Sequence, residues 1–412
     1  MPIPLIVPKH LTRSSIHRFK HTVNLRTATL ILTSLFALAS AQAIVLEWTG
    51  NSDNSIWGNT NNWNETGKGK GGDGIPNNSD EEVKFKKDVD AGEVISLENE
   101  SYNIEKLTVE TDTSFTLENG IINSAGELKV KGGGTLTLDI ARTGGGKTKV
   151  ENSGSKIIIA NEDALGTTSF GELKLKKGGA IESTVADLTI LNNLKIEDGG
   201  GIIGGAENIT IVGSISSKGD KGDLVISNTA ITTFTGNNTY KHDTVVTHGT
   251  LFVDSGSNTG SGDVTVDFGA FLDGSGSITG EAVINGTLNL RNGLTFNNSV
   301  AFGDSSTLQV QPTPNTTLIT LFAGNNMVSG LDSTTLELFL EDGYQANTTY
   351  SILGNNGGSL LFGDIKVFDT NGDYIPFIKE ANGNVTIVPE LQHFALLLGI
   401  VMLARVIPLR HR

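Results

Sequence analysis

The sequence predicts an all-β fold in which short strands coil into a parallel β-solenoid, also called a parallel β-helix. Three nine-residue stretches share one pattern, with apolar residues at the first, third and ninth positions and glycine at the sixth and seventh. They are residues 128–136 (LKVKGGGTL), 173–181 (LKLKKGGAI) and 194–202 (LKIEDGGGI). Each is a short alternating strand that runs into a tight turn. Their starts lie 45 and 21 residues apart, which predicts two coils and one coil of about 21 to 23 residues.

The composition favours stacked strands over an ordinary globular core. The 412 residues include 51 glycines, and only 6% are aromatic. Glycine at the corners supplies the positive φ angles that tight bends need, and the apolar strand residues of successive coils share a narrow interior. A flat antiparallel array of hairpins is the alternative fold, because alternating strands and glycine turns fit both.

The N-terminal residues 1–43 are typical of a secretory signal peptide with a helical apolar part. Five basic groups and no acid precede the apolar run 27–39 (TATLILTSLFALA). The basic groups are Lys9, Arg13, Arg18, Lys20 and Arg26. Small residues then suit signal peptidase, with cleavage expected after Ala43 and after Ala41 as the alternative. A membrane anchor or a buried helix competes with this interpretation, but 13 residues is short for a span.

Charge and cysteine content limit the partners. Removal of residues 1–43, with their five basic groups, changes the net charge from −15 to −20. This acidity argues against a nucleic-acid partner and against binding to an anionic membrane surface. The chain has no cysteine, which excludes disulfides, thiolate zinc sites and cysteine nucleophiles.

Residues 44–94 open with three tryptophans among Asn, Gly and Thr, namely Trp48, Trp57 and Trp63. We predict that they cap the open end of the β-helix core, because an uncapped end leaves strand edges unpaired. A carbohydrate-binding platform of exposed tryptophans is the alternative.

The β-solenoid repeats are expected over residues 95–316, and residues 233–272 are the most distinctive part. The stretch has Gly236, Asn237, Asn238, Thr239, Tyr240, Thr244, Val246, Gly249, Thr250 and Leu251 in that order. It resembles the passenger-associated transport repeat, also called the autotransporter-associated β-strand repeat. The resemblance implies a right-handed parallel β-helix. His242 stands where the family usually has a glycine two residues after the tyrosine.

From residue 317 to 387 the spacing changes. Asp-Gly, Asn-Gly and Asn-Asn pairs separate the expected strands, which predicts a hairpin-rich β module at the C-terminal end of the solenoid.

The chain offers little for catalysis, although parallel β-helices also carry polysaccharide lyases and hydrolases. Such sites need clustered carboxylates, usually with a basic group nearby. Between residues 44 and 389 there are only Arg142, Arg291, His242 and His248 besides lysines. The two histidines are expected to be a surface pair without function. Residues 369–373 (DTNGD) superficially resemble part of a calcium loop, but an Asn-Gly hairpin turn explains them better.

We therefore predict no enzyme, no catalytic or metal-binding residue and no cofactor. A polysaccharide-active lyase or hydrolase is the alternative, and a membrane-anchored carbohydrate-binding protein is another.

The C-terminal residues 388–412 form a tail of three parts. Val388, Pro389 and Glu390 precede an uninterrupted apolar run at 394–404, and the chain ends in Arg-His-Arg. The apolar part is expected to be a helix that inserts transiently into the inner membrane with its basic end in the cytoplasm. The tail resembles the PEP-CTERM sorting signal, although Leu391 replaces a frequent second proline and Arg405 interrupts the helix.

This resemblance implies an exosortase-type processing enzyme as partner, with Val388, Pro389 and Glu390 as the recognition segment. A tail that serves only as an anchor is the alternative. Together these features predict an exported, non-enzymatic β-solenoid at the cell surface or in the extracellular matrix of a Gram-negative-type bacterium. A role in adhesion or in the biofilm matrix is a hypothesis, and extracellular polysaccharide is its candidate polymer partner.

Overall fold

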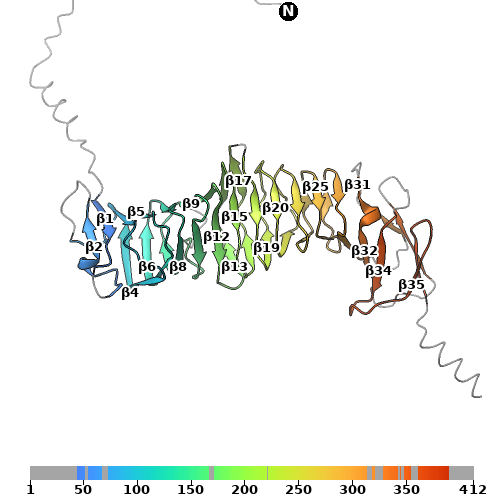
Figure 1. Cartoon of the computed structure of the whole chain (residues 1–412), viewed down its shortest axis with the longest axis horizontal. Helices are drawn as coiled ribbons and strands as arrows, with labels where there is room; N and C mark the ends of the chain where they lie inside the picture. The colour runs from blue at the N-terminus through green and yellow to red at the C-terminus, as the bar shows by residue number, and fades with distance from the viewer. Residues whose placement is uncertain are drawn as a thin grey trace, which may run out of the picture. The chain divides into compact units, whose positions relative to one another are not determined.

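The computed structural model describes residues 44–51, 54–66, 73–166, 171–219, 221–312, 318–320, 328–341, 344, 348–353 and 361–388. The expected signal helix with its cleavage sites at Ala41 and Ala43 lies outside these residues, as do Pro389, Glu390 and the expected C-terminal helix. The described part from residue 44 onward is all-β, with a parallel β-solenoid of about 11 turns (Figure 1). Helix within it is limited to the two 3-10 turns η1 (Thr60–Asn62) and η2 (Leu331–Ser333).

Three sheets form the sides of the solenoid, and we name them sheets A, B and C. In order of pairing, sheet A contains β17 (Ile215–Lys218), β14 (Leu194–Glu197), β11 (Leu173–Lys176), β9 (Thr148–Glu151), β7 (Leu128–Val130), β5 (Lys106–Val109), β3 (Glu81–Phe85), β1 (Ile44–Trp48) and β2 (Trp63–Glu65). Sheet B contains β31 (Val328–Ser329), β28 (Val300–Phe302), β25 (Ala282–Ile284), β22 (Val264–Val266), β20 (Thr244–Val246), β18 (Leu224–Ile226), β15 (Gly201–Ile203), β12 (Gly179–Ser183), β10 (Lys156–Ile159), β8 (Thr135–Thr143), β6 (Phe115–Ser124) and β4 (Glu93–Ile104). Sheet C contains β13 (Leu188–Ile190), β16 (Ile209–Ile211), β19 (Ile231–Phe234), β21 (Thr250–Val253), β23 (Phe271–Gly274), β26 (Thr287–Asn289), β29 (Thr307–Val310), β32 (Thr335–Phe339) and β34 (Asp364–Phe368).

Strand direction decides between the two folds that the sequence allowed. Every pair within sheets B and C is parallel, and in sheet A only β1 and β2 are antiparallel. From β11 to β19 the chain visits sheets A, B and C in turn. The flat array of hairpins is therefore excluded, and the predicted parallel solenoid is confirmed.

The repeat spacing is also confirmed. Leu173 pairs with Leu194 in the next coil, one turn on. Leu128 pairs with Thr148, which in turn pairs with Leu173, so the stretches at 128 and 173 lie two turns apart. The intervening strand β9 lacks the double-glycine turn of the other three.

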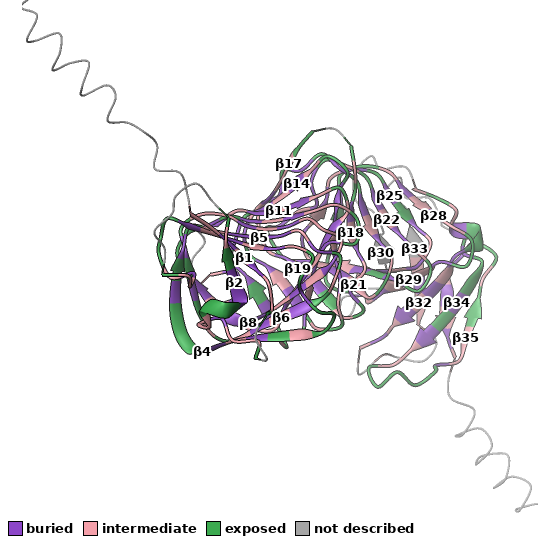
Figure 2. Cartoon of the chain, turned by 60° about the vertical axis from the view of Figure 1, so that its left-hand side comes forward, coloured by how far each residue is buried: buried purple, intermediate pink, exposed green. Residues whose placement is uncertain are grey.

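Buried and more exposed residues lie close together along the strands of the solenoid (Figure 2), and the buried apolar residues of successive coils form columns. In sheet A one such column passes through Val109, Val130, Val150, Leu175 and Ile196, all of them buried. Identical side-chain positions repeat in register, so each coil covers the apolar face of its neighbour. Burial of such side chains from water is the main force that holds the coils together.

Residues 44–66 close the first coil. β2 adds an antiparallel strand beyond β1, and Ile56 forms a bridge to Ser96 in sheet B. The edge of sheet A is thereby covered by a strand of opposite direction.

Smaller sheets complete the described part. β24 (Ser277–Ile278) pairs with β27 (Thr295–Phe296), and a four-stranded sheet contains β30 (Leu318–Thr320), β33 (Thr349–Leu353), β36 (Val385–Ile387) and β35 (Phe377–Lys379). β35 and β36 form an antiparallel hairpin whose turn includes Gly383 with φ of 86°. β32 and β34 continue the parallel sheet C beyond residue 316.

Candidate interaction face

Sheet A carries a charged outer surface because of the strand period. Alternate residues of a strand point to opposite faces, and in β7, β11 and β14 the buried first and third residues flank a partly exposed lysine. We call the outer surface of the parallel strands β1 to β17 in sheet A the lysine face. The charged side chains on these strands and next to them include Glu47, Glu82, Lys84, Lys86, Lys106, Glu110, Lys129, Lys131, Lys149, Glu151, Glu172, Lys174, Lys176, Lys195, Glu197 and Lys218.

The middle of the lysine face is a column of one residue type. Lys129 pairs in register with Lys149, Lys149 with Lys174, and Lys174 with Lys195. Four lysines therefore stand on four consecutive coils at the spacing of neighbouring strands, about 4.8 Å. We call these four residues the lysine column.

Beside the lysine column the signs alternate. Glu151 pairs in register with Lys176, and Glu197 with Lys218. Alternation of this kind places opposite charges on adjacent strands, which is the stabilising arrangement for cross-strand pairs.

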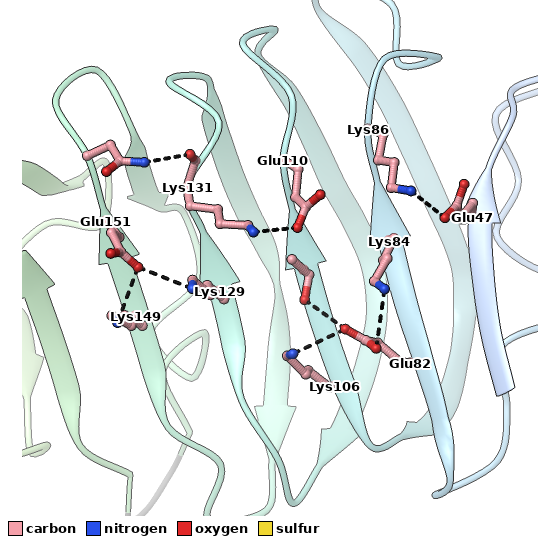
Figure 3. A network of polar contacts seen from close by, with 12 residues as sticks. Glu47, Glu82, Lys84, Lys86, Lys106, Glu110, Lys129, Lys131, Lys149 and Glu151 are labelled. Carbon is pink, nitrogen blue, oxygen red and sulfur yellow. Dashed lines mark hydrogen bonds and ion pairs between the residues drawn. The ribbon is translucent and has the colours of Figure 1, made fainter. Parts of the chain in front are cut away.

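Ion pairs connect the lysine column to neighbouring glutamates, and Figure 3 shows those of Lys129 and Lys149 with Glu151. Lys129 Nζ and Lys149 Nζ lie 3.1 Å and 3.2 Å from Glu151 Oε2. The Glu172 carboxylate forms ion pairs with Lys174 Nζ at 2.8 Å and with Lys195 Nζ at 3.5 Å. Glu151 and Glu172 are thus each paired with two lysines from successive coils.

This sharing lowers the pKa of the carboxyl groups. Partial burial raises the pKa of Glu151, but the hydrogen bonds from Lys129 and Lys149 outweigh it and bring the pKa to about 2. The pKa of Glu172 is also lowered, because contacts with Lys174 and Lys195 outweigh its partial burial. Glu151 and Glu172 are therefore held in their anionic form by the lysines that contact them.

The lysine face remains positive overall. Among the side chains named above, ten are lysines and six are glutamates, whereas the full chain has a net charge of −15. The side chains of the lysine column are 17 to 26% exposed, so their ammonium groups are within reach of solvent. A cationic strip therefore stands on an anionic protein.

The three tryptophans are buried, as the cap interpretation predicted. Trp57 is inaccessible to solvent, and its indole Nε1 donates to the Pro76 carbonyl at 3.1 Å. Trp63 Nε1 donates to the Trp57 carbonyl at 2.7 Å, and the rings of Trp48 and Trp63 meet edge to face at 5.0 Å. The rings fill the first coil and are not available as a carbohydrate platform.

The two arginines serve local packing. Arg142 is buried and donates from Nη1 to the Thr148 hydroxyl at 2.7 Å, and burial lowers its pKa to about 10. Thr148 interrupts the apolar column between Leu128 and Leu173, so this hydrogen bond satisfies a polar group inside the core. Arg291 lies over the Phe339 ring, 4.4 Å from its centroid.

The expected surface pair of histidines was wrong for His242. His242 is 5% exposed, whereas His248 is exposed. Gly262 of the next coil packs against the His242 carbonyl, closely enough that a Cβ there would collide with it. The turn after Tyr240 is therefore covered by the following coil.

Residues 369–373 form a hairpin turn, as predicted. The Asp369 carboxylate accepts hydrogen bonds from the amides of Asn371 and Asp373, at 2.9 Å and 2.8 Å. Gly372 takes the positive φ of 84°, and Phe368 bridges to Tyr374. The carboxylate is thus used to hold the turn.

Among the described residues, no group of three or more His, Asp or Glu side chains is placed to hold a metal ion. A pocket of about 250 Å³ beside β13 is lined by residues 162–163, 165–166 and 185–192, among them the acidic residues Glu162, Asp163 and Asp187. Asp187 accepts a hydrogen bond from Asn208 at 2.8 Å, and no lysine, arginine or histidine is among the described lining residues.

Of the predicted sorting motif, the described part of the chain contains only Val388, whose amide donates to the Pro376 carbonyl at 3.0 Å. No helix within the described ranges is long and apolar enough to cross a membrane. Comparison with protein-family models, with curated proteins and with solved structures returned no match.

Proposed function

We propose that the chain is an exported, non-enzymatic scaffold of the cell surface or extracellular matrix. The observation that carries this proposal is the stack of parallel coils that the described residues form from β1 to β34, with a tryptophan-filled first coil and charged side chains on its outer surface. Such a stack presents side chains at fixed intervals over many coils. The right-handed coiling implied by the repeat at 233–272 belongs to the same proposal.

The two ends of the sequence support an exported location. The basic and apolar residues before Ile44 fit a signal peptide, and the tail after Val388 fits a sorting signal with Pro389 and Glu390. In this proposal an exosortase-type enzyme releases the solenoid from a transient membrane anchor. Adhesion and matrix assembly are the activities that a surface scaffold of this kind would serve.

The first test is the intact mass, with mapping of the C-terminal peptides, of protein recovered from the surface and medium of its native host. We expect a chain that begins at Ile44 and ends near residues 388–390. Membrane-bound protein that still contains Arg412 would mean that the tail is a permanent anchor. Protein confined to the cytoplasm would overturn the exported location itself.

A further inference from the structure

We propose that the lysine face binds a linear carboxylated polysaccharide along the direction in which the coils stack. The inference deepens the proposed function, on which it rests, because such polymers are extracellular. It assigns the contacts to the lysine column, Lys129, Lys149, Lys174 and Lys195.

The lysine column is not the arrangement that sheet stability favours. Like charges directly opposite each other on neighbouring strands repel, and this face places four lysines in consecutive register. The adjoining positions alternate in sign on the same strands, as with Glu151 and Lys176 or Glu197 and Lys218. Opposite charges therefore alternate from strand to strand at the adjoining positions, whereas like charges follow one another in the lysine column.

The geometry of the lysine column selects a linear ligand. The four lysines lie at equivalent positions on adjacent strands, which are about 4.8 Å apart, so the line that they form runs along the direction in which the coils stack. A polymer with a negative group at regular intervals gains several contacts at once, each modest by itself. The full chain has a net charge of −15, so a negatively charged polymer is repelled by the chain as a whole and is attracted where lysines are in excess, as on the lysine face.

The mixture of charges favours a hydroxylated polycarboxylate over a nucleic acid. Sugar carboxylates accept from the lysines, and sugar hydroxyls both accept from lysine and donate to glutamate, so Glu151 and Glu172 have a use within the same contact. A DNA backbone has no hydroxyl groups along its length that could donate to these glutamates, so they only repel it. The charged positions of the lysine face alternate with buried apolar residues, and none of its outward residues on β7, β9, β11 and β14 is aromatic, whereas single-stranded nucleic acids are bound by base stacking.

The test uses the protein purified from its native host and polygalacturonate as the probe, with neutral dextran and a DNA duplex as competing polymers. We expect polygalacturonate to bind, dextran not to bind, and the affinity to fall steeply between 50 and 200 mM salt, about tenfold or more, as counterions compete. Changing the four residues of the lysine column to Gln is expected to reduce the affinity by at least about tenfold.

A matched control variant distinguishes the effect of losing the lysine column from the effect of a changed net charge. Lys156, Lys221, Lys241 and Lys366 lie outside the lysine face, and two of them also lose an ion pair when replaced, with Glu182 and Glu337. Their change to Gln alters the net charge equally and is expected to change the affinity less than about twofold. A Lys→Arg version of the column keeps the charges and is expected to keep binding. Circular dichroism and the thermal midpoint show whether each variant is folded.

Three outcomes overturn the inference: no binding of polygalacturonate by the folded protein, an equal loss in the control variant, or tighter binding of the DNA duplex. Loss of self-association in the column variant, measured by sedimentation, with polygalacturonate binding unchanged would instead make this face a contact between copies. None of these results depends on where the protein is located. Failure here therefore remains distinguishable from failure of the mass measurement that tests export.

Discussion

Buried aromatic side chains close the interior of the first coil. Trp57, Trp63 and Phe85 contact one another with ring centroids 4.9 to 6.1 Å apart. Both indole N–H groups of Trp57 and Trp63 have backbone carbonyl partners, so the rings add apolar area without leaving those donors unpaired.

Replacing Trp57 by Ala should lower the free energy of unfolding by about 3 to 5 kcal/mol, because a large buried ring is lost and a cavity remains. Urea denaturation followed by circular dichroism measures the change. Phe268→Ala is the control, since Phe268 is 80% exposed and its loss should cost less than about 0.5 kcal/mol. Equal effects of the two substitutions would contradict the cap role of Trp57.

Tyr240 should make the protein sensitive to alkaline pH. Burial raises the pKa of Tyr240 to about 12, against the opposing effect of its 2.7 Å hydrogen bond with Thr244. The unfolded chain loses this proton from pH about 10, whereas the folded chain holds it to about 12, so stability is lost as pH rises through this range. Denaturation midpoints measured from pH 9 to 12 should fall more steeply for the wild type than for Tyr240→Phe. Parallel curves would show that Tyr240 is not the group responsible.

At the scale of the elements, the strands of sheet A are coupled by shared carboxylates. Glu151 on β9 contacts Lys129 on β7 and lies 3.6 Å from Lys176 on β11. One side chain therefore connects three successive coils, which is more than an isolated surface pair provides.

This coupling predicts an acid-dependent loss of stability. The pKa of Glu151 is about 2 in the fold, below its ordinary value of 4.5, so its contribution is present above pH 4.5 and is lost as pH falls toward 2. Glu151→Gln should be less stable at pH 7 and should show a flatter profile between pH 4.5 and 2 in thermal denaturation. Glu281→Gln, an exposed carboxylate on sheet B's side of the coil, should leave the wild-type profile unchanged. A wild-type slope retained in Glu151→Gln would exclude this network as its source.

The elements most faithful to the repeat could be predicted from the sequence because stacking repeats the same side-chain environment at each coil. Leu173 and Leu194 occupy equivalent positions in adjacent coils, and both are the first residue of a nine-residue stretch with the same sequence pattern. The strand β9 could be recognised less clearly, because Thr148 stands where the other stretches have leucine. The hydrogen bond that Thr148 accepts from Arg142, six residues earlier on β8, has no counterpart in the repeat pattern of the sequence.

The burial of His242 and the lysine column were missed for different reasons. His242 is covered by the next coil at Gly262, which only the stacking reveals. The lysine column had a visible signal, because lysine is the second residue of all three nine-residue stretches. Its meaning depends on register, since only in-register coils bring those lysines into one line.

At the scale of the whole molecule, the described coils depend on closure of their first edge. β1, β2 and the bridge at Ile56 cover the strands that begin sheets A and B. An uncovered parallel edge is a template for pairing with another chain.

Deletion of residues 44–66 should therefore cause concentration-dependent association. Sedimentation velocity and light scattering would show species larger than the monomer that increase with protein concentration. The control is a chain shortened by the 24 residues 389–412, which lie at the other end of the sequence. A monomeric deletion variant that keeps its circular dichroism spectrum would contradict the capping role.

The reversed direction of β2 has a further consequence for growth. A parallel ladder offers an incoming strand evenly spaced hydrogen-bond partners, whereas an antiparallel ladder offers closely and widely spaced pairs in alternation. Suppose that the first coil of a second copy approaches β2 (Trp63–Glu65) in the direction of the other coils. Its hydrogen-bond donors and acceptors then do not match the spacing that the reversed strand β2 offers. β2 thus prevents further coils from adding at this end of the solenoid. It does so through its reversed strand direction and not by steric hindrance.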